Sequence, residues 1–502
     1  MFDGLIAFGH SIATFSTPAT IFYALLSSLI GVVMGALPGL TATMSLALVT
    51  TLTLKLQPSE ALLILICTYV GAIYGGSRSA ILLNIPGTPA SAASCLDGYA
   101  LARQGLAGRA MGIATTGSVL GTLIGMFFLA CFTPVLGDMA LKFGAYEFFW
   151  LALFGVLIAG TLTGDDPLKG WIAGIAGIFI ATIGQEAQYA YERFAWGVRD
   201  LAGGIQLVPA LIGAFGFAEL LTAMKERQLP VKISAFDTVI PRLKDITQYW
   251  RTILRSGLIG TGVGVVPGVG EDVAAWSSYA AAKRASKEKE KYGKGSIEGL
   301  MAAETGDNAC VPGAMIPVLT LAIPGSAPAA VLMAAMIIHG IKPGPMIMIE
   351  NPQFVYDVVA MMLFATIGIL IYGLVLTKAL VQVLRVPQHL ITPIIFVLCA
   401  VGSFAIAGRL FDVYVMLVFG LIGFGLRHFG YPMAPLVLGI VLGDLLEKNL
   451  RRALVLSDGS LTPFFTRPIS ACVAALIFGT VGWKLYSMRR DRLARGQGTL
   501  TP

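Results

Sequence analysis

Two Pro-Gly interruptions of long apolar segments constrain this chain most, because each has a second copy further along the sequence. Residues 35–41 read Gly-Ala-Leu-Pro-Gly-Leu-Thr, and residues 264–270 read Gly-Val-Val-Pro-Gly-Val-Gly. Residues 83–89 read Leu-Asn-Ile-Pro-Gly-Thr-Pro, and residues 321–328 read Leu-Ala-Ile-Pro-Gly-Ser-Ala-Pro. A helix broken inside hydrocarbon leaves backbone groups without partners unless protein or a water-filled cavity supplies them. Breaks at matching places in two halves therefore predict a transporter's binding site near the middle of the membrane.

Composition sets the class of fold. The 502 residues are 56% hydrophobic and 13% charged, with a mean hydropathy of +0.79, whereas ordinary globular proteins carry about 25% charged residues. We therefore expect an all-α integral membrane protein with about 10–12 transmembrane segments in the lipid bilayer. The basic residues behind the net charge of +7 lie in a few loops. That distribution is typical of cytoplasmic loops and not of a nucleic-acid-binding face.

The cysteines and histidines predict no disulfide, metal or cofactor site. The six cysteines are scattered through apolar segments without a CxxC pair, and the four histidines are isolated. The first residues, Met-Phe-Asp-Gly, lack a basic region, so no cleaved signal peptide is expected.

The breaks belong to a longer repeat. Residues 209–213 (Pro-Ala-Leu-Ile-Gly) correspond to residues 435–439 (Pro-Leu-Val-Leu-Gly), which extends the likeness to the end of each half. The predicted organisation is a first membrane repeat, a basic cytoplasmic loop, a second membrane repeat and a final transmembrane helix, at residues 18–224, 225–252, 253–447 and 468–488.

The charges that flank the first break of each half bear on the orientation of the two copies. In the first half, only Lys55 flanks the break at Pro38-Gly39. In the second half, the break at Pro267-Gly268 has Arg251 and Arg255 before it and a lysine-rich run at 283–294 after it. This asymmetry favours inverted repeats. Basic residues at 448–452 would then face outward, which favours parallel copies instead.

The segment 253–282 is apolar, has Pro267-Gly268 at its centre and is basic at both ends. Each arm has about 14 residues, or ~21 Å of helix, which is too short to cross ~30 Å of hydrocarbon. A re-entrant hairpin with its tip at Pro267-Gly268 explains both features. The alternative is one long helix kinked at Pro267, which places one basic flank outside.

Hydroxyl residues begin the half-helices after the breaks, as Thr88 does before Pro89. A helix N-terminus offers free N–H donors and about half an elementary charge, so several aimed at one point bind carboxylates. The alternative is that each Pro-Gly only kinks a helix and that Ser or Thr caps it locally. The predicted substrate-binding residues are Pro38, Gly39, Thr41, Thr43, Arg78, Asn84, Pro86, Gly87, Thr88, Pro267, Gly268, Gly270, Pro324, Gly325 and Ser326.

Charged residues inside apolar segments are functional candidates, because burial of an unpaired charge is costly. Arg78 and the pair Glu271-Asp272 lie in such segments. Two hypotheses stay open for Arg78. It pairs with Glu271 or Asp272 across the two halves, or it grips a substrate carboxylate with its two-pronged guanidinium.

Three residues with side-chain oxygen atoms have helical spacing. Glu304, Asp307 and Asn308 lie at i, i+3 and i+4, on one face of a helix. Hard cations take oxygen ligands, so these residues are predicted to hold a coupling ion, either H⁺ or Na⁺, with Na⁺ near Gly39, Gly268 and Asn308. The alternative is that they satisfy backbone groups at the break.

Several stretches carry a likeness to a known family. They are Gly-Ala-Leu-Pro-Gly-Leu at 35–40, Tyr-Gly-Gly-Ser at 74–77, Ile-Leu-Leu-Asn-Ile-Pro-Gly at 81–87, Leu-Asp-Gly-Tyr at 96–99, Tyr-Gly-Lys-Gly at 292–295, Asn-Ala at 308–309, Leu-Ala-Ile-Pro-Gly-Ser at 321–326, and His-Gly at 339–340 with Lys-Pro-Gly-Pro at 342–345. Together they span nearly the whole chain, which resembles the large membrane subunit of the tripartite tricarboxylate transporters.

The resemblance implies a secondary transporter of the bacterial inner membrane that works by alternating access, in an elevator-like manner. It would take a citrate-like tricarboxylate or a related carboxylate from a periplasmic solute-binding protein, with Na⁺ or H⁺ as the driving ion and a small membrane subunit as partner. The family's Pro-Gly tips map onto residues 38–39 and 267–268, and its inner breaks onto 86–87 and 324–325. Many members have small or hydroxylated residues where this chain has Glu271-Asp272.

Two other classes of function compete with a carrier. A channel is disfavoured because no carbonyl filter or ring of like charges is evident. An intramembrane aspartyl protease is suggested by Asp357 after Tyr356 and by Asp444 after Leu-Gly. Val441 stands where that class needs glycine, so the chain is predicted not to be an enzyme.

Overall fold

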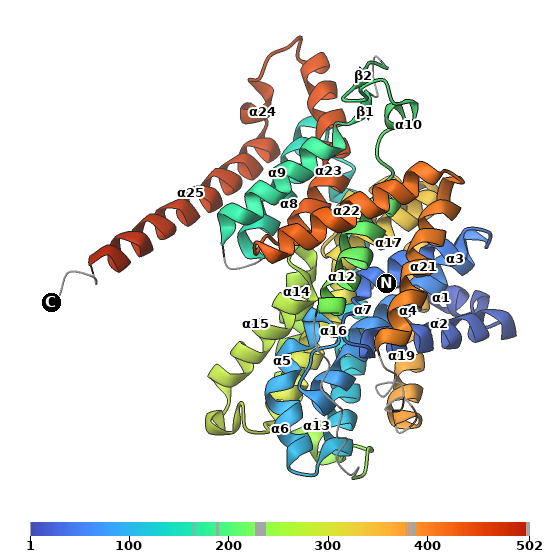
Figure 1. Cartoon of the computed structure of the whole chain (residues 1–502). Coiled ribbons are helices and arrows are strands. Elements are labelled where there is room, and N and C mark those ends of the chain that lie inside the picture. Colours follow the sequence, from blue (N-terminus) through green and yellow to red (C-terminus); the bar gives the residue numbers. More distant parts are fainter. Residues whose placement is uncertain are drawn as a thin grey trace. The chain divides into compact units, whose positions relative to one another are not determined.

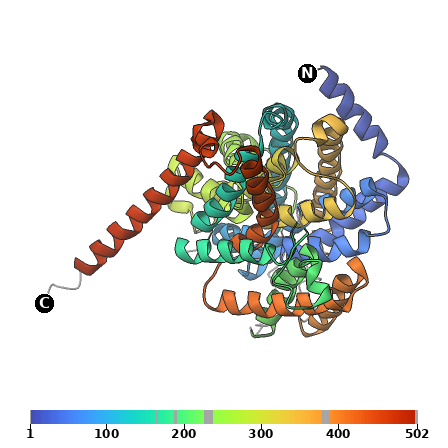
Figure 2. The ribbon, with the colours of Figure 1, turned by 90° about the horizontal axis from the view of Figure 1, so that it is seen from above.

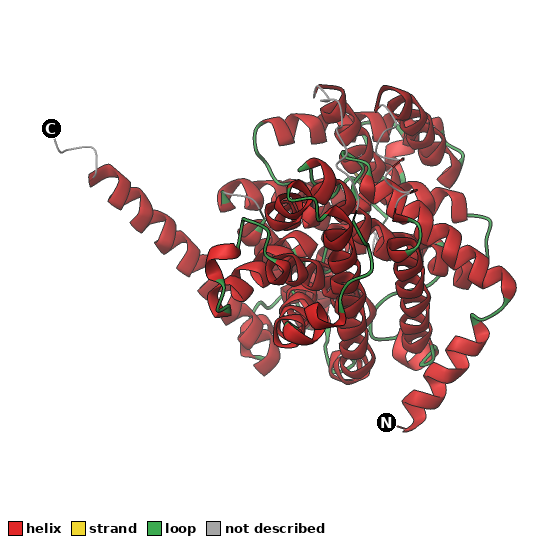
Figure 3. Ribbon diagram, turned by 90° about the horizontal axis from the view of Figure 1, so that it is seen from below, coloured by secondary structure: helices red, strands yellow, loops and turns green. Residues whose placement is uncertain are grey.

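The computed structural model describes residues 2–163, 166–186, 190–225, 237–377, 379, 382 and 388–497. Over these ranges the regular structure is almost entirely helical (Figure 3). The exception is one short antiparallel pair, β1 (Gly184–Gln185) and β2 (Glu192–Arg193). The chain is therefore the all-α protein that its composition predicts. It divides into unit 1 (Met1–Leu141 and Gln206–His428) and unit 2 (Lys142–Ile205 and Phe429–Pro502).

Unit 1 carries all four Pro-Gly breaks. Its N-terminal part contains α1 (Phe2–Thr14), α2 (Pro18–Ala36), α3 (Ala42–Thr53), α4 (Pro58–Leu83), η1 (Pro89–Ser91), α5 (Ala92–Ser94), η2 (Cys95–Tyr99), α6 (Ala100–Arg103) and α7 (Ala107–Ala140). Its second part contains α11 (Leu207–Leu211), η3 (Ile212–Phe217), α12 (Ala218–Lys225), α13 (Leu243–Gln248), α14 (Trp250–Val265), α15 (Gly270–Ala285), η4 (Lys289–Lys291), α16 (Ile297–Leu321), α17 (Ala327–Ile338), α18 (Ile347–Glu350), α19 (Phe354–Leu374), α21 (Gln388–Ala407) and α22 (Leu410–His428).

The predicted helical hairpin is present, while its entry into the membrane and return on one side stay a prediction. Helices α14 and α15 pack against each other, and the chain between them leaves the helical conformation at Val266 (φ −80°, ψ 120°) (Figure 1). A single helix kinked at Pro267 is thereby excluded. Leu37 ends α2 in nearly the same conformation (φ −80°, ψ 115°), immediately before Pro38. Each first break is thus a true interruption between two helices.

Each second break ends a long, continuous helix. Helix α4 stops at Leu83 and α16 stops at Leu321, although α16 contains Pro312 and Pro317. Every residue of α16 from Glu298 to Thr320 is buried, as is nearly all of α4 from Ala61 to Leu82. Because both helices are enclosed by protein, the backbone groups freed at their ends can find protein partners.

Unit 2 comprises α8 (Ala145–Leu162), α9 (Pro167–Ala181), α10 (Arg199–Ala202), α23 (Met433–Leu456), α24 (Pro463–Thr466) and α25 (Pro468–Gln497), with the two short strands. Helix α9 packs on α23 through glycine, since a Cβ at Gly177 would lie 2.1 Å from the Leu436 carbonyl oxygen. The first half of α25 packs on α8 around Trp150 and Phe464, and its C-terminal half leaves the other helices of the unit (Figure 2).

Helix length and composition support a membrane protein. Seven of the described helices are long and apolar enough to cross a bilayer, namely α2, α4, α7, α8, α19, α22 and α25. Six shorter apolar stretches accompany them, including α3 and α17, which follow the breaks. Helix α25 begins at the residue where the final transmembrane helix was predicted to begin.

The predicted repeat boundaries remain a prediction. The division into two compact units cuts across both repeats, since residues 142–205 and 429–447 belong to unit 2. In the predicted cytoplasmic loop, residues 226–236 lie outside the described ranges. The rest of that loop contains α13, which Arg109 of α7 holds through an ion pair of 2.8 Å to Asp245.

Candidate functional site

The two halves of unit 1 build their second breaks with the same backbone geometry. Asn84 ends α4 in the left-handed conformation (φ 58°, ψ 27°), and Ala322 ends α16 in the same conformation (φ 57°, ψ 36°). Asparagine tolerates this region, but alanine does so only at a cost. Both residues stand two positions before the proline of their Pro-Gly. The shared geometry is what the repeat predicts at its breaks, while the inversion of the two copies stays a prediction.

Glycine brings the two breaks of each half into backbone contact. A Cβ at Gly87 would lie 2.1 Å from the carbonyl oxygen of Gly35, and a Cβ at Gly325 would lie 2.0 Å from that of Gly264. No side chain fits at such distances. The turns themselves also need glycine, because Gly39, Gly268 and Gly270 have φ of 90°, 73° and 83°.

The predicted hydroxyl residues lie at the starts of the half-helices. The Thr41 hydroxyl accepts the Met44 N–H at 3.2 Å and caps α3, and the Ser326 hydroxyl accepts the Ala329 N–H at 3.3 Å and caps α17. Thr43 is buried in the first turn of α3.

Thr88 differs from the other hydroxyl residues. It is 2% exposed, and its Oγ1 has no hydrogen-bond partner among the described residues. The cap at this position runs the other way, with the Thr88 N–H donating to the Ser91 hydroxyl at 3.3 Å. A buried hydroxyl without a partner is unusual, and here it lies beside a break.

A tyrosine connects the two halves at the breaks. Tyr69 on α4 donates to the Glu271 carboxylate in the first turn of α15, and its hydroxyl lies 2.7 Å from the Ser326 hydroxyl. All three side chains are buried. One hydrogen-bonded cluster therefore joins Tyr69 of the first half to Glu271 and Ser326, which follow the two breaks of the second half.

Arg78 does not pair with Glu271 or Asp272 in this structure, which corrects one of the two hypotheses for this residue. Its guanidinium, 1% exposed, lies 4.3 Å from the centre of the Tyr74 ring and donates to the Ser77 hydroxyl at 3.1 Å. Its charge also acts on the Glu304 carboxylate of α16, although the two side chains form no ion pair. Arg78 lies on α4 and Glu271 on α15. Sequence spacing cannot predict which carboxylate of another helix lies nearest to Arg78, because that depends on how the helices pack.

The three predicted coupling-ion residues are buried on α16. Glu304 accepts from Ser94 at 2.5 Å and from Ser118 at 3.0 Å, and Asn308 donates to that Ser118 hydroxyl at 3.0 Å. Asp307 Oδ2 and Asn308 Oδ1 are buried and have no hydrogen-bond partner in the described ranges. Within the described residues no three His, Cys, Asp or Glu side chains converge as a metal set. Whether these residues hold an ion remains a prediction.

Sequence reasoning missed Tyr69, Ser94 and Ser118. A tyrosine in the middle of an apolar segment carries a weak signal, since a buried phenol oxygen usually has a partner. The two serines carry no signal, because serine is common in membrane helices and its partner here comes from a helix distant in sequence.

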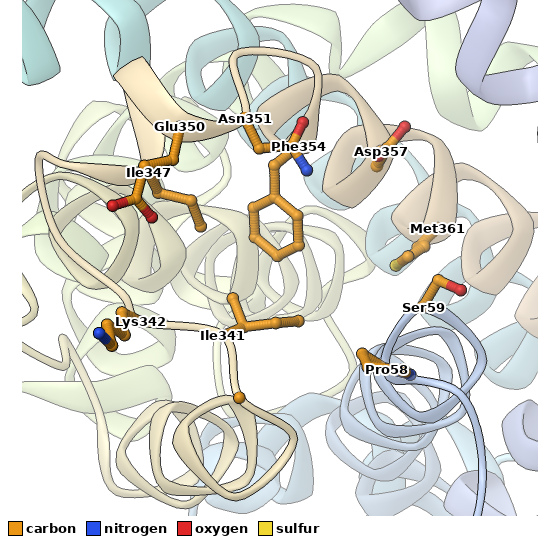
Figure 4. Close-up of a pocket in the computed structure, with 11 residues that line it drawn as sticks. Pro58, Ser59, Ile341, Lys342, Ile347, Glu350, Asn351, Phe354, Asp357 and Met361 are labelled. Atoms are coloured by element: carbon orange, nitrogen blue, oxygen red, sulfur yellow. The ribbon is translucent and has the colours of Figure 1, made fainter.

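A cavity of about 500 Å³ lies elsewhere in unit 1, where α4 and α19 begin and the chain passes from α17 to α18 (Figure 4). Lys342, Glu350, Asn351 and Asp357 give it polar walls. None of the predicted site residues lines it. The Asp357 carboxylate accepts from Ser11 at 2.6 Å, and that bond attaches α1 to α19.

Comparison with known proteins settles the class. Residues 21–438 match the profile described as the tripartite tricarboxylate transporter TctA family. The chain belongs to this family. It is 36% identical over 461 residues to an "uncharacterized 52.8 kDa protein in TAR-I ttuC' 3'region" of Agrobacterium vitis, covering 92% of each chain. It is also 37% identical over 217 residues to an uncharacterised protein in the TAR-II ttuC' 3' region of the same organism, covering 43% of this chain and 90% of that one. No solved structure matches the chain significantly.

Membership of the TctA family makes the chain a multi-pass membrane component of a tripartite transporter and not an enzyme. The two aspartates that suggested a protease have other partners, since Asp444 forms an ion pair with Lys448 at 2.7 Å and Asp357 accepts a hydrogen bond from Ser11. The family resemblance seen in the sequence motifs is confirmed.

Proposed function

We propose that this TctA-family chain is the large subunit of a cation-coupled carrier that imports a citrate-like tricarboxylate or a related carboxylate across the bacterial inner membrane. A periplasmic binding protein delivers the substrate, and a small membrane subunit completes the complex. The breaks of unit 1 bind the carboxylate, and elevator-like movement exposes them to each side in turn, with Na⁺ or H⁺ as the coupling ion.

One observation carries this proposal. The unpartnered, buried Thr88 hydroxyl and the Tyr69–Ser326 hydroxyl pair lie beside the inner breaks of the two halves. Hydroxyl donors and the N-terminus of a half-helix suit a carboxylate, and the close backbone approach of the paired glycines places the breaks of each half together.

The direct test is replacement of Thr88 by valine. The change keeps the shape of the side chain and removes a hydroxyl that has no partner among the described residues, so the substrate-free protein should be as stable as the wild type or slightly more stable. If the hydroxyl donates to a bound carboxylate, citrate affinity should fall about tenfold or more, because a hydrogen bond to a charged group contributes about 1.5–3 kcal/mol.

Binding of radiolabelled citrate, succinate and acetate to the purified protein, with and without Na⁺, measures this loss. The matched control is Thr116→Val, since the Thr116 hydroxyl donates to the Gly112 carbonyl of its own helix. Equal affinities in the wild type and in Thr88→Val would exclude this hydroxyl from the substrate site. If the wild type binds none of the three acids, carboxylate transport itself is wrong.

A further inference from the structure

Glu271 is a buried carboxylate that the substrate site does not account for. It lies in the first turn of α15, three residues after Gly268, and is 5% exposed. The ion pairs formed by the described residues do not include it. An ionised carboxylate in such a place is costly unless something neutralises it. The neutralising species must be a proton on the carboxylate or a cation beside it.

Within the part of the chain that the structure describes, the groups that face Glu271 offer no positive charge. Tyr69 of α4 donates to it, Asp272 follows it on α15, and its own charge acts on Cys310 and Asp307 of α16. Each of these side chains is neutral or acidic. A substrate carboxylate that arrives at the Ser326 cap would add one more negative charge beside Glu271. Substrate binding therefore requires that Glu271 be neutral.

The hydrogen bonds of Tyr69 also require that Glu271 be neutral when substrate binds. A phenol has one proton to donate. In this structure Tyr69 gives that proton to Glu271, while its oxygen lies 2.7 Å from the Ser326 hydroxyl. Once Glu271 carries a proton of its own, it no longer needs the Tyr69 donor. Tyr69 and Ser326 can then both donate to an incoming carboxylate.

We propose that Glu271 carries the coupling proton and that its protonated form admits the carboxylate substrate to the Tyr69–Ser326 donors. This inference rests on the proposed function and names the coupling ion and its residue. In each cycle one proton moves from periplasmic water to a Glu271 oxygen, crosses with the substrate and leaves to cytoplasmic water. No other bond changes. When the proton leaves, the restored negative charge and the returning Tyr69 donor expel the substrate.

The test measures proton-driven uptake and substrate exchange separately. The wild-type chain is reconstituted in liposomes with its small subunit and binding protein, and an inward proton gradient drives uptake of radiolabelled citrate, succinate or acetate. In Glu271→Gln the side chain is permanently neutral. Gradient-driven accumulation should fall to the level of empty liposomes, while exchange of internal for external substrate should continue and lose its pH dependence.

The matched control is Asp272→Asn, which neutralises the neighbouring carboxylate and should keep both gradient-driven uptake and exchange. A second readout needs no transport. Infrared difference spectra on adding substrate should show the band of a protonated carboxylic acid in the wild type and in Glu271→Asp, and that band should be absent from Glu271→Gln. This readout keeps the inference testable if Glu271→Gln assembles poorly.

The outcomes separate this inference from the function beneath it. If the wild type moves none of the three acids, the proposed function fails, and the inference fails with it. If the wild type transports but Glu271→Gln still accumulates substrate on a proton gradient, Glu271 does not carry the proton. Uptake that depends on Na⁺ and ignores the proton gradient, or loss of proton coupling in Glu304→Gln but not in Glu271→Gln, also overturns the inference.

Discussion

Gly325 packs directly on the backbone of Gly264, with room for no Cβ between them, since that atom would lie 2.0 Å from the Gly264 carbonyl oxygen. Gly87 and Gly35 repeat the relationship in the first half of unit 1, at 2.1 Å. These contacts hold the second break of each half against the helix that leads to its first break. The geometry of the candidate site thus depends on glycines that have no chemistry of their own.

Gly264 also packs on α16, and Gly264 and Gly262 on α14 give a matched test of that second contact. A Cβ at Gly264 would lie 2.5 Å from the Cys310 carbonyl oxygen, whereas a Cβ at Gly262 meets nothing within 4 Å. We expect Gly264→Ala to destabilise the protein by about 1–3 kcal/mol through overpacking. Gly262→Ala should stabilise it by up to about 1 kcal/mol, because alanine favours the helix. Thermal unfolding in detergent compares them, and equal melting temperatures would contradict the packing described here.

The positions of the breaks could be predicted from sequence because proline and glycine act on their own backbone. Pro267-Gly268 interrupts α14 and α15 where the pattern places the interruption, and the basic flanks of the segment distinguish a hairpin from a kinked helix. The caps at Thr41 and Ser326 are equally local. Local chemistry of this kind needs no knowledge of which helix lies opposite.

The partners of the buried charges could not be predicted, because they depend on tertiary packing. The sequence spacing is compatible with an Arg78–Glu271 pair. In the structure the Arg78 charge acts on Glu304, and Glu271 accepts a hydrogen bond from Tyr69. The packing of α9 on α23 in unit 2 could not be predicted from the sequence for the same reason. It rests on Gly177 meeting the backbone of Leu436, a contact between segments far apart in the chain.

Ala322 is strained in a way that a substitution can release. Its φ of 57° places an alanine in the left-handed region, at a cost of about 1–2 kcal/mol. We expect Ala322→Gly to stabilise the protein by about 1 kcal/mol, since the relief of strain exceeds the extra entropy of the unfolded chain. Ala281→Gly in the helical interior of α15 is the control and should destabilise by about 1 kcal/mol. A drop in melting temperature for both variants would show that Ala322 is not strained.

His339, which follows α17, should make stability depend on pH. Its Nε2 lies 3.1 Å from the Thr53 hydroxyl, and partial burial lowers the pKa of the imidazole below its ordinary value of 6.5. The unfolded chain then binds a proton more readily than the folded chain, so stability falls as the pH drops below about 6.5. The melting temperature of the wild type should fall between pH 7.5 and pH 5.5 by more than that of His339→Gln. An identical pH profile for the two proteins would remove His339 as a source of this dependence.

Asp97 should fix the loop between α15 and α16. Its Oδ1 accepts three backbone N–H groups, from Gly293 at 2.8 Å, Gly295 at 2.9 Å and Ser296 at 2.7 Å, and its Oδ2 accepts the Tyr279 hydroxyl at 2.9 Å. Asp97→Ala leaves the two buried donors, the Ser296 N–H and the Tyr279 hydroxyl, and the two partly buried N–H groups without an acceptor. Because hydrogen bonds to a charged group contribute about 1.5–3 kcal/mol each, we expect a loss of stability of at least about 3 kcal/mol.

Limited trypsin digestion reports the effect of Asp97→Ala on the loop itself, because Lys291 and Lys294 are exposed next to the anchored backbone. Cleavage there should accelerate strongly. Tyr279→Phe removes one of the four hydrogen bonds and should produce a smaller increase, while Asp200→Asn, at an exposed aspartate, should produce none. If Asp97→Ala is cut at the wild-type rate, the loop must be held by contacts other than this carboxylate. The conformation of the chain entering α16, and with it the position of Glu304, would then be independent of Asp97.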